Sequence, residues 1–147
     1  MADAYLTALT MLGARELSEV QVRTRLLRRK FEAAEIDEAV ERLRNDGTLD
    51  DRRVAVAAAR VESSIRHRGR ARVLQKIRQL GIANSTAESA VTEVFADVDE
   101  GALLDRALER RLRGKTPKSL DEKGRARIVR GLVGQGFSIE AILKRLR

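Results

Sequence analysis

The chain contains no cysteine, no tryptophan, a single proline and only 3% aromatic residues in 147 positions. Without cysteine it has no disulfides and no thiolates for catalysis or metal binding. The lone proline, Pro117, leaves long stretches free to form helix. With 43% hydrophobic residues but few aromatics, a core must consist of Leu, Ile, Val and Ala, which favours helix packing over a β-sandwich. The sequence therefore predicts an all-α fold.

Long apolar runs and catalytic groupings are also missing. No run approaches the roughly 18–20 apolar residues of a membrane span, and the first residues lack the pattern of a secretion signal. We therefore expect a cytoplasmic location and no membrane partner. The only histidine, His67, lies among arginines, without the carboxylates or further histidines that a metal site or a general base needs. We expect no enzymatic activity, no cofactor and no metal.

The apolar residues recur in three similar units. Leu49-Asp50-Asp51 and Val98-Asp99-Glu100 lie 49 positions apart, and each places an apolar residue before acids that can cap a helix. The predicted units are 1–48, 49–98 and 99–147. Offsets of 51 and 106 from the first unit align apolar positions in the other two. The aligned residues are Val22 with Val73 and Ile128, Leu26 with Ile77 and Leu132, and Phe31 with Ile82 and Phe137.

Each unit contains three stretches with helical spacing of apolar residues. The first stretches are Tyr5, Ala8, Leu9, Leu12; Val54, Ala57, Ala58, Val61, Ile65; and Leu104, Ala107, Leu108, Leu112. The third stretches are Ile36, Ala39, Val40, Leu43; Ala87, Ala90, Val91, Val94; and Ile139, Ile142, Leu143, Leu146. Small units of this kind gain stability by packing on neighbours. We expect three tandem three-helix repeats in an elongated, curved row, with a compact nine-helix globule as the alternative.

Capping residues and glycines mark the helix ends. Three serines fit a capping box: Ser18 with Gln21, Ser85 with Glu88, and Ser119 with Glu122. Gly131 and Gly134 fall inside the last middle helix, where each should destabilise it by about 1 kcal/mol relative to alanine.

The net charge is +8, with 30 Lys and Arg against 22 Asp and Glu. The basic residues form three sets, each on or beside a middle helix. The sets are Arg23, Arg25, Arg28, Arg29, Lys30; Arg60, Arg66, Arg68, Arg70, Arg72, Lys76, Arg78; and Arg106, Arg110, Arg111, Arg113, Lys115, Lys118, Lys123, Arg125, Arg127, Arg130. Recurrence in three units predicts a basic stripe that binds a polyanion or an acidic groove. The few aromatics lie on apolar patterns, which argues against a base-stacking surface.

Several segments together resemble one known family. Gly47-Thr48-Leu49-Asp50-Asp51-Arg52-Arg53-Val54-Ala55, Ser18-Glu19-Val20-Gln21-Val22-Arg23-Thr24-Arg25-Leu26 and Gly136-Phe137-Ser138-Ile139-Glu140-Ala141-Ile142 are similar to motifs of RecX-type regulatory proteins. The resemblance covers nearly the whole chain. It implies a three-repeat protein that lies in the groove of the RecA–DNA filament and modulates, mainly inhibits, ATP hydrolysis and strand exchange by RecA.

The expected partners are therefore the RecA protein and the RecA–DNA filament, with weak binding to DNA, and the chain is expected to be a monomer. The expected RecA- and DNA-binding residues are Arg23, Arg25, Arg28, Arg29, Lys30, Arg66, His67, Arg68, Arg70, Arg72, Lys76, Arg78, Lys123, Arg127 and Arg130. The main alternative is a stand-alone DNA-binding protein, because three-helix units resemble helix-turn-helix modules. A scaffold for acidic partners is the third possibility.

Overall fold

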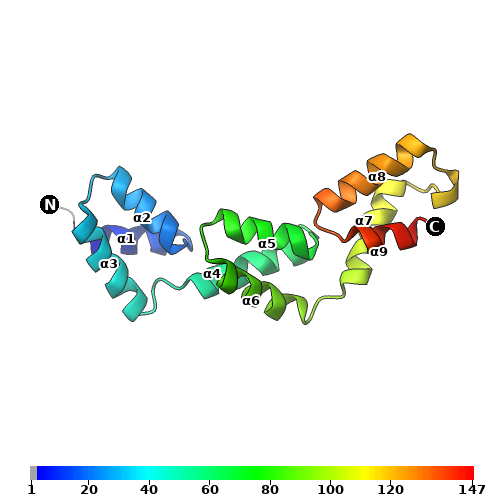
Figure 1. Ribbon diagram of the computed structural model, residues 1–147. Helices are drawn as coiled ribbons and strands as arrows, with labels where there is room; N and C mark the ends of the chain where they lie inside the picture. Colours follow the sequence, from blue (N-terminus) through cyan, green and yellow to red (C-terminus); the bar gives the residue numbers. More distant parts are fainter. Residues whose placement is uncertain (1–2) are drawn as a thin grey trace.

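The computed structural model describes residues 3–147, which form nine α-helices joined by short turns and no β-strand (Figure 1). The α-helices are α1 (Ala4–Ala14), α2 (Glu19–Arg28), α3 (Ala33–Asn45), α4 (Asp51–Arg60), α5 (Arg70–Gln79), α6 (Asn84–Phe95), α7 (Glu100–Leu112), α8 (Glu122–Gly134) and α9 (Ile139–Arg145). A π-helical turn, Val61–Ile65, extends α4, and a 3₁₀ turn, Pro117–Ser119, precedes α8. None of the helices in this range is long and apolar enough to cross a membrane.

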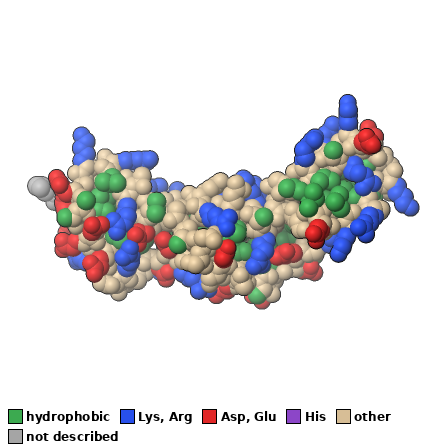
Figure 2. Space-filling model, in the orientation of Figure 1, with side chains coloured by type: hydrophobic (Ala, Val, Ile, Leu, Met, Phe, Trp, Pro, Cys, Tyr) green, Lys and Arg blue, Asp and Glu red, His purple; other side chains and the backbone are tan. Residues whose placement is uncertain are grey.

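The helices form three bundles in a row that curves along its length (Figures 1 and 2). We call them unit 1 (α1–α3), unit 2 (α4–α6) and unit 3 (α7–α9). Each unit has its own apolar cluster, centred on Val22, Leu26 and Leu43 in unit 1, on Val73, Ile77 and Val91 in unit 2, and on Leu104, Leu132 and Ile142 in unit 3. The predicted all-α fold of three tandem repeats in an elongated row is confirmed, and the compact globule is excluded.

Unit 2 departs from the predicted core at the end of its first helix. Val61 and Ile65, predicted to be apolar core positions, are exposed, and Ile65 reaches 70% exposure. The π-helical turn changes the angular spacing of the last residues, so that Glu62 and Ser63 face inward instead. In unit 3, Ile139 and Leu143 of α9 are likewise exposed, whereas Ile142 is buried.

One of the three predicted capping boxes forms. The Ser18 hydroxyl accepts from the amide of Gln21, and the Gln21 side chain accepts from the amide of Ser18. The other two predictions are wrong, because helix α6 begins one residue before Ser85 and α8 is capped by Asp121. The Asp121 carboxylate accepts from the amide of Gly124, so an acid two residues after Ser119 takes the capping role.

Units 1 and 2 meet where the end of α5 abuts the start of α2. The Ser18 hydroxyl donates to the carbonyl of Leu80 over 2.5 Å, and the Asp51 carboxylate accepts from the amide of Glu19 over 2.8 Å. Burial raises the pKa of Asp51, and the bond from the Glu19 amide partly offsets this. Gly81, with φ of +83°, is required here because a Cβ on it would lie 2.7 Å from the Cβ of Val20. We call this contact the first joint.

Units 2 and 3 meet in the same way, with the turn after α8 against the start of α5. The amide of Gly69 donates to the carbonyl of Gln135 over 2.8 Å, and the amide of Ala71 to that of Gly136 over 3.3 Å. A Cβ on Gly69 would lie 2.5 Å from the carbonyl carbon of Gly136. We call this contact the second joint. The two joints set α2, α5 and α8 head to tail along one side of the row (Figure 1).

Candidate functional site

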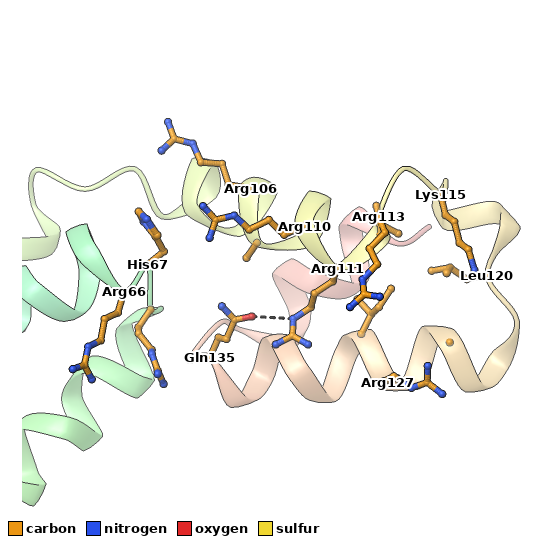
Figure 3. Close-up of a pocket in the computed structure, with 15 residues that line it drawn as sticks. Arg66, His67, Arg106, Arg110, Arg111, Arg113, Lys115, Leu120, Arg127 and Gln135 are labelled. Atoms are coloured by element: carbon orange, nitrogen blue, oxygen red, sulfur yellow. Dashed lines mark hydrogen bonds between the residues drawn. The ribbon is translucent and has the colours of Figure 1, made fainter.

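A basic cleft of 790 Å³ lies between unit 2 and unit 3, beside the second joint (Figure 3). Its walls come from the turn after the π-helix, from α7 and from α8. Eight cationic side chains line it and no carboxylate does; they are Arg66, Arg68, Arg106, Arg110, Arg111, Arg113, Lys115 and Arg127. Apolar side chains that include Leu112, Leu120 and Ile128 complete the lining. The cleft can therefore attract and hold anions.

Helix α7 and its C-cap residue supply half of this charge. Arg106 and Arg110 are four residues apart, which places them on one face of the helix, and Arg113 follows as the left-handed C-cap residue. Within residues 3–147, none of the three guanidinium groups has a carboxylate within 4.0 Å. The sequence showed this set of arginines, but the predicted site residues did not include it. The spacing of four residues between Arg106 and Arg110 would have indicated a basic face on α7.

Arg111 is held in place by a glycine of α8. A Cβ on Gly131 would overlap a terminal guanidinium nitrogen of Arg111, so the guanidinium group lies directly against the helix backbone. Its Nε donates to the side-chain oxygen of Gln135 over 2.9 Å (Figure 3). Gly131, which weakens α8 as a helix former, thus makes room for a cation of the cleft.

A buried carboxylate supports the opposite wall. Glu62 is only 4% exposed, and its oxygens lie 3.3 Å from a guanidinium nitrogen of Arg66 and 3.8 Å from Nε of Arg68. The amide of Arg68 also donates to the backbone carbonyl of Glu62 over 2.9 Å. Between the two arginines, His67 adopts a left-handed φ of +54°. The π-helical turn therefore holds two arginines at the edge of the cleft by burying the acid that pairs with them.

The predicted site residues are divided among different surfaces. Four line the cleft: Arg66, His67, Arg68 and Arg127. Four others, Arg25, Arg28, Arg29 and Lys30, gather at the end of α2 in unit 1, on the far side of unit 2 from the cleft. Lys123 and Arg130 are exposed on α8 but do not line the cleft.

Four of the remaining predicted residues, Arg23, Arg70, Arg72 and Arg78, interact with groups of their own chain. Arg23 forms ion pairs with Glu19 and Asp37, and the hydrogen bond to Asp37 raises the pKa of Arg23. On α5, the guanidinium group of Arg70 lies 3.7 Å from Glu100, and that of Arg78 lies 3.9 Å from Glu88. Arg72 and Lys76 of α5 are both half-buried, and the Arg72 guanidinium group donates to the side-chain oxygen of Gln75 over 3.1 Å. Ion pairs therefore partly neutralise the charge along α5, as Glu62 does for Arg66 and Arg68 in the cleft, whereas Arg106, Arg110 and Arg113 have no such partner among residues 3–147.

No group of three His, Asp or Glu side chains that could hold a metal ion occurs in the part of the chain that the structure describes. The side-chain chemistry of the cleft is that of guanidinium groups, one ammonium and one imidazole. Such a set binds phosphates or carboxylates through charge-assisted hydrogen bonds.

Comparisons with known proteins agree on one family. The family model for the first three-helix domain of RecX matches residues 4–43. The chain is 33% identical over 144 residues to the regulatory protein RecX of Trichlorobacter lovleyi, covering 96% of this chain and 92% of that protein. It is 32% identical over 146 residues to the regulatory protein RecX of Chlorobium phaeobacteroides, covering 97% and 91%.

A solved structure shows the same fold. The crystal structure of RecX from Lactobacillus salivarius superimposes with a TM-score of 0.84 at 19% identity, covering 97% of this chain and 94% of that one. A second RecX crystal structure gives a TM-score of 0.81 at 21% identity, covering 94% and 67%. With the sequence identities above, these findings establish that the chain belongs to the RecX family of regulatory proteins.

Proposed function

We propose that the chain binds the RecA–DNA filament through its basic surface and modulates RecA, mainly by inhibiting ATP hydrolysis and strand exchange. The observation that carries the proposal is the head-to-tail order of α2, α5 and α8 along one side of an extended, curved molecule (Figure 1). A rigid row of this kind is suited to a long groove, because it reaches several subunits at once. Several linked contacts raise the overall affinity without any single strong contact.

The proposed mechanism involves no chemical step by this chain. The family is one of regulatory proteins, and binding alone is sufficient to inhibit if the regulator stabilises one state of the filament or blocks a DNA strand. The predicted units 1–48, 49–98 and 99–147 would then act as consecutive contact modules. The basic end of α2 and the cleft between units 2 and 3 would reach different parts of the filament.

The direct test is the DNA-dependent ATPase activity of RecA. We expect the purified protein to slow ATP hydrolysis at a ratio to RecA near one. No effect at that ratio would contradict the proposal. Tight, sequence-specific binding to duplex DNA without any effect on RecA would instead favour the stand-alone DNA-binding alternative.

A charge reversal on α5 tests whether the middle helices carry the interaction. We expect the double variant Arg72→Glu, Lys76→Glu to inhibit RecA more weakly, because it replaces two cations on one helix face with acids. The matched control is Arg15→Glu, Lys144→Glu, which changes the net charge equally at exposed positions outside this face. Equal inhibition by both variants, with unchanged helix content, would show that this face of α5 is not used.

A further inference from the structure

The side chains of the basic cleft between units 2 and 3 are suited to a ligand that can bind in the absence of the recombinase. We propose that the cleft binds the phosphodiester backbone of one nucleic-acid strand, through phosphates alone and without regard to sequence. Unit 2 holds the strand from one side and unit 3 from the other. DNA binding at this site is a property of the isolated chain, whether or not the proposal about RecA holds.

The end of α7 brings three arginines to the cleft one after another. Arg106 and Arg110 are four residues apart, which corresponds to about 6 Å along a helix at 1.5 Å per residue. Arg113 follows at the left-handed C-cap of the helix and also lines the cleft. Arg106, Arg110 and Arg113 have no carboxylate within ion-pair distance among residues 3–147, so their charge is available to a ligand.

Other cations of the cleft are already oriented before a ligand arrives. Arg111 lies against Gly131 and bonds to Gln135 over 2.9 Å. Arg66 and Arg68 are directed by the buried carboxylate of Glu62. Fixing a long side chain in advance removes part of the entropy loss that binding would otherwise cost. Three of the eight cations of the cleft are therefore held in place before a ligand binds.

The lining favours phosphates over bases and over acidic peptides. No Phe or Tyr side chain lines the cleft, so bases have no ring on which to stack. The lining contains seven guanidinium groups, whose paired donors match phosphate oxygens in bidentate geometry. A nucleic-acid strand presents closely and evenly spaced charges, whereas the carboxylates of an extended peptide lie farther apart, on side chains that alternate in direction. Contacts to phosphates carry no sequence information.

The test is the affinity of the purified protein for a fluorescently labelled single-stranded oligonucleotide of mixed sequence, measured by anisotropy without recombinase over a range of salt concentrations. The cleft variant is Arg106→Gln, Arg110→Gln, Arg113→Gln. We expect its affinity at low salt to fall at least tenfold. The slope of log affinity against log salt should become shallower by about 2, since each lost phosphate contact removes about 0.7.

The matched control is Arg15→Gln, Lys144→Gln, Arg147→Gln, which removes the same charge at exposed positions outside the cleft. We expect it to keep at least a third of the wild-type affinity, with the slope unchanged. Equal losses in the two variants would overturn the proposal, because binding would then follow net charge. Displacement of the oligonucleotide by polyglutamate at equal charge concentration would also overturn it, in favour of an acidic protein segment. Circular dichroism establishes that both variants are folded.

Discussion

At the scale of single residues, one glycine of α8 lowers the stability of the helix but leaves room for a cation. Gly131 lies in the interior of α8, where alanine would be favoured by about 1 kcal/mol. The space that a Cβ would fill is occupied by the guanidinium group of Arg111. Glycine here is explained by a contact across the cleft and not by the backbone of its own helix.

We predict opposite effects of Gly131→Ala on stability and on binding. The added methyl raises the helix propensity of α8, so the free energy of unfolding in urea should rise by up to about 1 kcal/mol. It also displaces Arg111, since its Cβ would overlap a guanidinium nitrogen, so oligonucleotide affinity should fall about threefold. Gly134→Ala is the control, because a Cβ there has no heavy atom within 4 Å. If both variants bind DNA like the wild type, Arg111 does not contribute.

At the scale of helices, hydrophobic spacing was a good guide where helices are regular. The buried positions of the middle helices, such as Val73 and Ile77, are those that the alignment of units predicted. The third helices of units 1 and 2 also bury the predicted residues. A regular helix has one angular period, so the apolar residues that share a face can be identified from the sequence alone.

The π-helical turn and the cleft could not be predicted in the same way. One extra residue in the turn rotates the side chains after it around the helix axis, so the pattern that includes Ile65 pointed to the wrong face. The cleft depends on the distance between units, and that distance is set by two glycines far apart in sequence, Gly69 and Gly136. Periodicity contains no information about such a contact. The set of basic residues on α7 was visible in the sequence, but its position opposite the turn at Arg66 was not.

The second joint gives a test at this scale. Gly69 has an ordinary extended conformation, with φ of −78°, so alanine fits the backbone of unit 2. Its Cβ would, however, lie 2.5 Å from the backbone of Gly136. We predict that Gly69→Ala opens the joint, so the amides of position 69 and Ala71 should exchange with solvent at least tenfold faster. The apolar core of unit 2 is not involved, so the exchange of its deepest amides should not change.

Gly134→Ala again serves as the control, since it lies near the joint without touching it. Unaltered exchange at position 69 and Ala71 would mean that the two units are held together by other contacts. Because the cleft lies beside the second joint, Gly69→Ala should also weaken oligonucleotide binding. The same variant therefore tests whether the cleft depends on the joint.

At the scale of the whole molecule, the turns after the three middle helices differ in what they contact. Lys30, Gly81 and Gly136 occupy equivalent places after the three middle helices, and all three have positive φ. A Cβ at either glycine would collide with the neighbouring unit. The turn after α2 has Lys30 at this place instead of glycine, and its charge adds to that of the arginines at the end of α2. Cations at the C-terminal end of a helix are also favoured by the helix dipole.

The extended shape leads to a prediction about the molecule in solution. A compact domain of 147 residues has a radius of gyration of about 15 Å. Three bundles in a curved row distribute their mass farther from the centre (Figure 2), so small-angle X-ray scattering should give a radius clearly above that value. Gly69→Ala should broaden the distance distribution, because unit 3 would then move relative to unit 2. A radius near 15 Å would mean that the units fold back on one another, and the side formed by α2, α5 and α8 would then not be open to a filament groove.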